Sequence, residues 1–228
     1  MNYFKKIWAI VWKDIRAEIR TKEIFSSMFI FSLLVLVIFN FSIDLLEVNP
    51  LDIAQGVLWI AFTFSGILGL NRSFLFEKEN DCLQGLMLTP VDRSAIYFGK
   101  MLGNLIFMLI MEAIAVPIFV VLFNIGIYDK IISLAIVIIL GTLGFVTVGT
   151  LFSAMSVNIK AREVMLPILL FPIVVPVIIA SVKSTGAILT GKPFDDIISW
   201  LKLIAVFDVV FLVVSFLSLN ILLRSKFI

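Results

Sequence analysis

Long charge-free runs of apolar residues alternate with short polar segments along the whole chain. A helix needs about 20 apolar residues to cross the hydrocarbon core of a bilayer, and six of these runs are long enough. None shows the roughly ten-residue alternation of a transmembrane β-strand, so helices remain the way to satisfy the backbone in lipid. The pattern predicts an all-α bundle, one transmembrane domain over 1–228, with spans at about 24–43, 53–71, 101–123, 131–156, 164–182 and 203–223.

The first 23 residues show a different pattern, with apolar residues on one helical face and cations on the opposite face. The apolar positions are Phe4, Trp8, Val11, Ile15 and Ile19. This arrangement is typical of a helix that lies in the cytoplasmic membrane interface, and a simple basic anchor is the alternative that stays open. The segment has no long apolar core and no small-residue cleavage site, so we do not expect a removed signal peptide.

Composition narrows the function classes. The chain is 61% hydrophobic and 15% charged, against about 25% charged in ordinary soluble domains, so it is a membrane protein. It contains no phosphate-binding G-x-x-x-x-G-K-[ST] motif, no H-E-x-x-H, no G-x-S-x-G and no cysteine pair, and we expect no enzyme. Without histidine, metal and haem sites lose their commonest ligand, so we expect no cofactor held by this chain.

Lysine and arginine predict the orientation of the spans. With six spans both termini share one side, where fourteen of the eighteen cations fall. The other side has only Lys130, Lys183, Lys192 and Lys202. The imbalance predicts that both termini, and the segment 72–100, lie in the cytoplasm.

The segment 72–100 is the most polar part of the chain. Leu83, Leu86 and Met87 form an apolar stripe at helical spacing after an acidic lead-in. The sequence "TPVD" predicts a helix start with Thr89 as N-cap and Pro90 in the first position. We therefore expect a surface helix that docks a cytosolic partner, with a merely solvated loop as the alternative. The candidate docking residues are Glu77, Glu79, Leu83, Leu86, Met87, Pro90, Asp92 and Arg93.

Two carboxyl groups lie inside the predicted spans. Glu112 is twelve residues past Lys100, about 18 Å into the bilayer, where an ionisable side chain is costly and a functional candidate by default. Pro117 predicts a kink close by. Asp208 lies about 9 Å inward from Lys202. A functional and a structural role stay equally open for Glu112, whereas a structural role is favoured for Asp208.

Small residues and prolines predict how two spans pack. Gly141, Gly144 and Gly149 in the fourth span permit close helix approach. Three prolines in the fifth span predict a bend there, at Pro167, Pro172 and Pro176.

An interfacial N-terminal helix, six spans and a cytoplasmic helix between spans two and three resemble the permease half of an ABC-2-type transporter. More narrowly, the chain resembles the CcmB family, the haem exporter B proteins of cytochrome c maturation. The segments concerned are "GVLWIAFTFSGILGLNRSF" at 56–74, "GLMLTPVDRSAIYFGK" at 85–100, "EAIAVPIFVVLFN" at 112–124, "LGTLGFVTVGTLFSAMS" at 140–156, "LPILLFPIVVPVIIAS" at 166–181 and "WLKLIAVFDVVF" at 200–211. Asp81-Cys82 departs from the Gly and small residue expected there.

The resemblance implies a permease subunit of the bacterial inner membrane with both termini cytoplasmic. It implies four partners besides the lipid bilayer: a cassette ATPase that hydrolyses ATP, a haem-handling membrane subunit, a small single-span subunit and a periplasmic haem chaperone. Haem is then the ligand that the complex handles, and no nucleic acid is expected. Two alternatives stay open: an ABC-2-type exporter of a lipid, drug or polysaccharide, and a proton-coupled secondary transporter that uses Glu112 and Asp208.

Overall fold

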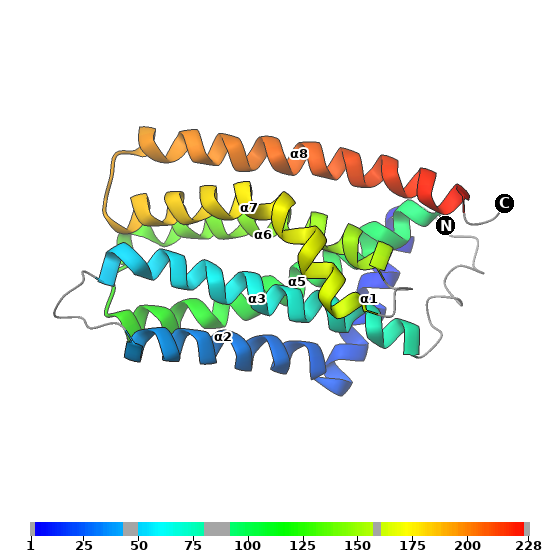
Figure 1. Ribbon diagram of the computed structural model, residues 1–228, viewed down its shortest axis with the longest axis horizontal. Coiled ribbons are helices and arrows are strands. Elements are labelled where there is room, and N and C mark those ends of the chain that lie inside the picture. Colours follow the sequence, from blue (N-terminus) through cyan, green and yellow to red (C-terminus); the bar gives the residue numbers. More distant parts are fainter. Residues whose placement is uncertain (1–2, 43–49, 80–91, 157–160, 226–228) are drawn as a thin grey trace.

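The computed structural model describes residues 3–42, 50–79, 92–156 and 161–225, and every long regular element in them is an α-helix (Figure 1). Six of the helices are long and apolar enough to cross a membrane, which confirms the predicted all-α multi-span fold. The elements are α1 (Tyr3–Thr21), α2 (Glu23–Ser42), α3 (Pro50–Glu79), α5 (Arg93–Phe123), the short 3-10 helix η1 (Tyr128–Lys130), α6 (Ile131–Ser156), α7 (Arg162–Leu189) and α8 (Phe194–Ser225).

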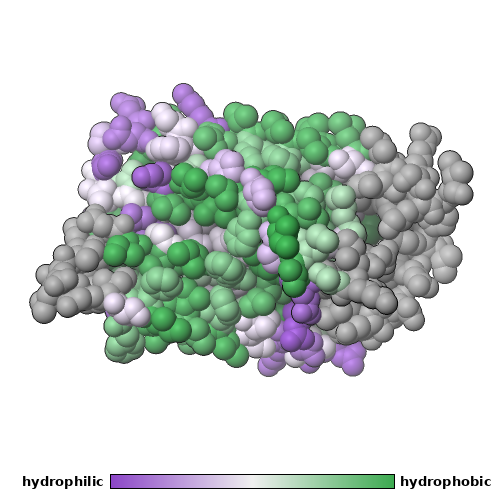
Figure 2. Space-filling model, in the orientation of Figure 1, coloured by the Kyte–Doolittle hydropathy of each residue, from purple (hydrophilic) through white to green (hydrophobic). Residues whose placement is uncertain are grey.

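The six long helices run side by side, and α1 lies across one end of them (Figure 1). The last turns of α3 and α8 and the first turns of α5 and α7 lie at this same end, which we call the α1 end. Figure 2 shows apolar side chains over the middle of the visible face and hydrophilic ones toward its ends. This distribution suits a bundle whose middle faces lipid.

Several helices extend beyond the predicted spans. The fifth span was predicted to end at 182, before Lys183, but α7 continues to Leu189. The sixth was predicted to begin after Lys202, but α8 begins at Phe194. A helix satisfies its own backbone whether lipid or water surrounds it, and lysine can extend its ammonium group toward water. Charged residues therefore mark where lipid contact weakens, not where a helix stops.

The start of α5 also differs from the prediction. The helix begins at Arg93 and not at Pro90, because the N-cap residue Asp92 has a non-helical ψ of 134°. The Asp92 carbonyl accepts the first bonds of the helix, from the Ala95 and Ile96 amides at 2.9 and 3.3 Å. The predicted cap residue Thr89 and Pro90 itself lie outside the described residues.

Helix α6 lies at the centre of the bundle and contacts α3, α5, α7 and α8. A Cβ atom on Gly141 would collide with the Trp59 ring, and one on Gly149 would collide with Leu70. The glycines therefore let the neighbouring helices approach closely, as predicted. Helix α7 contains all three prolines and bends about midway along its length in Figure 1.

Helix α1 has two apolar faces, one exposed and one buried, whereas the sequence pattern predicts a single apolar face. Ile7 and Val11 are buried against Ala95 of α5. Placing Val11 on the lipid-facing side was therefore wrong. Phe4 and Trp8 remain exposed, at 81% and 61% of their surface. The exposed apolar face fits the membrane interface, while the buried face attaches α1 to the bundle.

Candidate functional site

A buried ion pair joins α1 to α5. The Lys100 ammonium lies 2.9 Å from the Asp14 carboxylate, and the two side chains are only 4% and 11% exposed. The two helices can come this close because α5 presents glycines to α1: a Cβ on Gly99 would lie 2.8 Å from Ile10. We call this contact the α1–α5 clamp, defined by Asp14, Lys100 and the Ile10–Gly99 approach.

Two further contacts hold α1 against the first turn of α5. The Tyr3 hydroxyl donates to the Ser94 hydroxyl at 3.0 Å. The Lys6 ammonium lies 3.9 Å from the Asp92 carboxylate, which is largely exposed. Together with the clamp, these contacts extend over about two turns of α5. They attach α1 to the helix that follows the predicted docking segment.

The connection between α1 and α2 is a sharp elbow. Lys22 has a positive φ of 57°, which a non-glycine residue rarely adopts. The Glu18 carboxylate is buried inside the elbow and accepts a hydrogen bond from the Phe25 amide at 2.8 Å, near the start of α2. Burial raises the pKa of Glu18, although hydrogen bonds from the Phe25 and Ile24 amides oppose the increase. Glu18 thus links the end of α1 to the beginning of α2.

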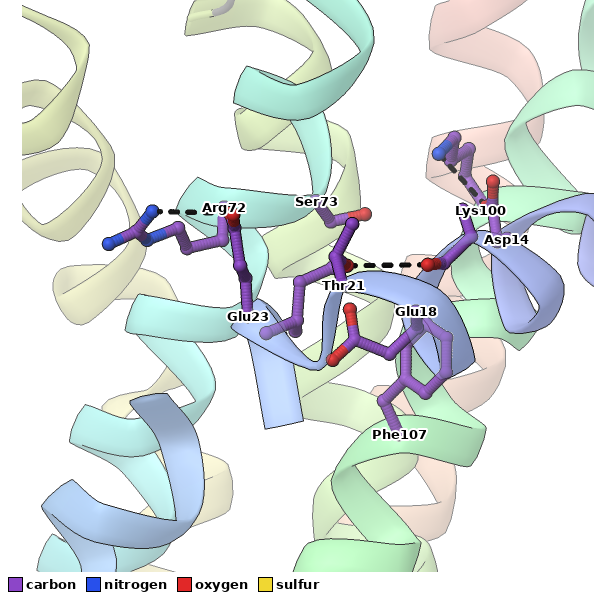
Figure 3. Close-up of a pocket in the computed structure, with 10 residues that line it drawn as sticks. Asp14, Glu18, Thr21, Glu23, Arg72, Ser73, Lys100 and Phe107 are labelled. Atoms are coloured by element: carbon purple, nitrogen blue, oxygen red, sulfur yellow. Dashed lines mark hydrogen bonds and ion pairs between the residues drawn. The ribbon is translucent and has the colours of Figure 1, made fainter. Parts of the chain in front are cut away.

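A small hollow of about 30 Å³ lies between these helices, with room for water (Figure 3). The clamp forms one side of it, and an Arg72–Glu23 ion pair at 3.6 Å joins α3 to α2 on the other. Glu18 lies between the two pairs in Figure 3. At the α1 end, two ion pairs therefore connect α1 to α5 and α2 to α3 around one small polar hollow.

Only some of the predicted docking residues are described by the structure, and these lie next to this region. Asp92 is exposed and paired with Lys6. Glu77 and Glu79 lie in the last turns of α3, and Arg93 begins α5; only their backbones are described. The remaining candidates lie outside the described residues: Leu83, Leu86, Met87 and Pro90.

Glu112 lies in the interface between α5 and α6 and is 1% exposed. The Thr142 hydroxyl lies 2.8 and 2.9 Å from its two carboxyl oxygens and donates to them. Pro117, one turn further along α5, is exposed on the other side of the helix. The geometry therefore gives Glu112 a helix-to-helix hydrogen bond and does not bring Pro117 to it.

Asp208 is 3% exposed and lies against the backbone of Gly144 in α6. Neither of its carboxyl oxygens has a hydrogen-bond partner among the described residues. Thr142 and Gly144 are two residues apart on α6, so they point roughly 200° apart. Glu112 and Asp208 therefore lie on opposite sides of α6, and the structure does not unite them in one site.

The sequence alone did not identify Asp14, Glu18 or Lys100 as site residues. A signal was present, because Asp14 and Glu18 continue the spacing of Ile7 and Val11 along one face of α1. Carboxylates in register with an apolar stripe indicate buried partners. Within the described parts of the chain, no group of three or more His, Cys, Asp or Glu side chains could hold a metal ion.

The fold and these contacts define a multi-span α-helical membrane protein with charged contacts at one end. The family model described as "CcmB protein" matches residues 5–225, so the chain belongs to the CcmB family. It is a multi-pass protein of the bacterial inner membrane.

Three relatives with the name "Heme exporter protein B" illustrate the range of similarity. The Rhodobacter capsulatus protein is 28% identical over 171 residues, 75% of this chain and 78% of the relative. The Bradyrhizobium diazoefficiens protein is 22% identical over 185 residues, 80% and 82% of the two chains. The Escherichia coli K12 protein is 28% identical over 97 residues, 42% and 44% of the two chains.

Proposed function

We propose that this chain is the membrane subunit of an ATP-driven complex that delivers haem to a periplasmic haem chaperone, or releases it there, for cytochrome c biogenesis. The observation that supports this most strongly is the family match over 5–225 together with relatives named "Heme exporter protein B". Haem is the cargo of the complex. A haem-handling membrane subunit and a small single-span subunit complete its membrane part.

The chain itself is a transport subunit and not the ATPase. Its 228 residues contain no Walker-type phosphate-binding motif. The energy must therefore come from a partner, a cassette ATPase that binds the membrane subunit from the cytosol. This division of labour needs a docking surface and a mechanical connection from that surface to the spans.

The α1 end faces the cytoplasm in this proposal. By the order of the spans in the sequence, fourteen of the eighteen lysine and arginine residues share the side of the termini, and cytoplasmic loops carry such an excess. The opposite end, with Lys130 and Lys192, then faces the periplasmic chaperone. A reporter inserted near Asp81 should read cytoplasmic and one near Gly191 external.

The docking surface in this proposal is the segment 77–88, with Leu86 and Met87 in its apolar stripe and Glu79 in its acidic lead-in. Because this segment leads into α5 along the chain, its displacement would be transmitted to the first turn of α5. From α5 it passes through the Asp14–Lys100 pair to α1, and through Glu18 to the start of α2. The clamp and the elbow thus supply the mechanical connection that the proposal needs.

Two measurements test the proposal. In a deletion strain, the chain should restore c-type cytochromes that retain haem on denaturing gels, and a cassette ATPase should co-purify with it. ATPase recovery without cytochrome restoration would indicate an exporter of another cargo. If the chain accumulates to its normal level but restores no cytochromes and co-purifies with no ATPase, the ABC-type assignment is wrong.

Paired substitutions test the docking surface. Leu86→Asp should abolish co-purification of the ATPase, because it buries an unpaired charge at the centre of the contact. Glu79→Lys, as the matched rim change, should weaken recovery only slightly. Full recovery with Leu86→Asp would exclude this segment as the docking surface.

A further inference from the structure

Helix α8 packs against α5, α6 and α7, and its fully buried side chains form one row. Within residues 195–218, the buried residues are Ile197, Ile204, Asp208 and Ser215. These positions recur at intervals of seven, four and seven, which keeps them on one face of the helix. On either side, Val206 and Val209 are each 63% exposed. The fully buried row of α8 therefore has a carboxyl group at its centre.

Gly144 of α6 forms the seat for this carboxyl group. A Cβ atom on Gly144 would collide with Asp208 Oδ1 and would lie 3.5 Å from Val177 of α7. Only glycine leaves enough space for Asp208 to lie directly on the α6 backbone. The shape of α6 thus fits α8 with Asp208 in this position.

The seat contains no charged or polar side chain that pairs with Asp208. Its two oxygens have no hydrogen-bond partner within the described residues. Helix α6 has no titratable residue over 131–156. On α7, Glu163 and Lys183 are exposed, and on α8 itself Asp195, Asp196 and Lys202 are exposed. Among the described titratable groups of α5, Lys100 pairs with Asp14 and Glu112 with Thr142. Tyr97 donates to the Thr147 carbonyl and lies beside Ser215 of α8.

A carboxylate anion without donors is strongly disfavoured in such surroundings, so the seated group is the neutral acid. Ionisation requires water or a donor, and the closed seat has room for neither. We propose that Asp208 is a proton-operated latch: α8 is seated on α6 while the carboxyl group holds its proton, and transfer of that proton to water accompanies separation of α8 from Gly144.

Two buried hydroxyl groups lie near this contact. Ser181 of α7 lies against Gly141 of α6, beside the Trp59 ring of α3, and its Oγ has no partner in the described chain. Ser215, two turns from Asp208 along α8, lies beside the Tyr97 hydroxyl group of α5. Water that enters once α8 has moved would hydrate the carboxylate, which stabilises the ionised state only in the open arrangement.

Ser215→Cys, in a Cys82→Ser background, reports on whether α8 has moved. The purified full-length chain in lipid nanodiscs is treated with a water-soluble maleimide between pH 6 and pH 8.5. The same reporter is measured with Asp208→Asn, and the ratio of the two rates cancels the ionisation of the thiol itself. The rate with Asp208 divided by the rate with Asp208→Asn should rise at least fivefold from pH 6 to pH 8.5, because only the aspartate can ionise and release α8. Glu112→Gln, which changes the opposite side of α6, should behave like the parent reporter.

A ratio that stays constant over this pH range would overturn the latch. Gly144→Ala gives a second test, because its methyl group displaces Asp208 and should make the reporter reactive at every pH; protection in that variant would also contradict the proposal.

A further measurement needs no substitution and decides the question if Asp208→Asn does not accumulate. Dicyclohexylcarbodiimide modifies protonated carboxyl groups in apolar surroundings, and mass spectrometry locates the adduct. Modification of Asp208 should fall at least fivefold from pH 6 to pH 8.5. Equal modification at both values would show that the proton is never released. None of these measurements involves haem or an ATPase, so they are independent of the proposed transport function.

Discussion

Helices α5 and α8 are both long and both bury ionisable groups, but the buried groups differ in whether they have hydrogen-bond or ion-pair partners. Every buried polar side chain of α5 in the described structure has a hydrogen-bond or ion-pair partner on another helix: Ser94 with Tyr3, Tyr97 with Thr147, Lys100 with Asp14, Asn104 with Thr150 and Glu112 with Thr142. The Asp208 carboxyl group of α8 has no hydrogen-bond partner in the part of the chain that the structure describes, and the Ser215 hydroxyl group of α8 lies beside the Tyr97 hydroxyl group.

The difference indicates two kinds of attachment. Specific polar pairs fix the rotation and the height of α5 against α1 and α6, because moving α5 would leave buried donors and acceptors unmatched. Around Asp208, close packing on glycine and apolar contact hold α8. We therefore infer that α5 moves together with α1 and α6, whereas α8 can separate from α6 at Asp208 without losing a hydrogen bond of that carboxyl group.

The largest expected effect comes from breaking the clamp of α5. Asp14→Leu leaves the buried Lys100 ammonium without its carboxylate, and removing one partner of a buried pair costs about 3–5 kcal/mol. The free energy of unfolding, measured by titration with dodecyl sulfate in mixed micelles, should fall by that amount. The matched control is Asp92→Asn, since the Lys6–Asp92 pair at 3.9 Å is exposed on the Asp92 side and should contribute less than about 1 kcal/mol.

The double variant Asp14→Leu, Lys100→Met separates charge from packing. Because it removes both charges, it should recover most of the stability that Asp14→Leu loses. Lys100→Met alone completes the cycle: if its loss and that of Asp14→Leu simply added up in the double variant, the clamp would be a packing contact only.

A smaller effect is expected at the other polar pair of α5. Thr142→Val keeps the shape of the side chain but removes the hydroxyl group that donates to Glu112. The unmatched buried carboxyl group should lower the free energy of unfolding by about 1–3 kcal/mol. Thr142→Ser retains the hydroxyl group and should lose clearly less. Equal losses for the two variants would mean that the methyl group, and not the hydrogen bond, holds α5 to α6.

The six spans could be predicted from the sequence because length and hydropathy alone determine whether a helix can cross lipid. Their ends could not, since α7 and α8 extend past Lys183 and Lys202 as helices whose outer turns need no lipid. The amphipathic character of α1 could also be predicted, but one hydrophobic pattern cannot distinguish an exposed residue such as Trp8 from a bundle-facing one such as Val11.

The positions of Glu112 and Asp208 inside spans were apparent from the sequence, but their surroundings were not. Whether Glu112 meets Thr142, and whether Asp208 meets only Gly144, depends on the rotation of each helix about its axis. That rotation results from the packing of the whole bundle. The clamp was missed for the same reason, because Asp14 and Lys100 are far apart in sequence and meet only where α1 crosses α5.

Glu18 extends the comparison to the elbow between α1 and α2. Its pKa is raised by burial above 4.5, so the folded state holds the proton more tightly than the unfolded state. This contribution to stability is complete below 4.5 and is lost as the pH rises through the raised value. Glu18→Gln keeps an acceptor for the Phe25 amide and removes the titration. The variant should therefore gain stability relative to the parent as the pH rises, by less than Thr142→Val loses.

Thermal unfolding of the purified protein in detergent, monitored by tryptophan fluorescence between pH 4 and pH 8, measures this difference. A stability difference that does not change with pH would mean that Glu18 has the same pKa in both states. Arg72, which pairs with the neighbouring Glu23 at 3.6 Å in an exposed position, offers a control. Arg72→Gln should leave the pH dependence caused by Glu18 in place.

The smallest expected effect lies at Ser181 of α7, which packs against Gly141 of α6 beside the Trp59 ring. Ser181 is fully buried, and its hydroxyl group has no partner in the described residues. Ser181→Ala therefore breaks no hydrogen bond and removes a polar atom from an apolar contact, so stability should stay within about 0.5 kcal/mol of the parent or rise. Thr142→Val and Ser181→Ala each remove one buried hydroxyl group beside α6. If Ser181→Ala lost as much stability as Thr142→Val, the contact between α6 and α7 would contain a matched hydrogen bond after all, and polar pairing would not distinguish the attachment of α5.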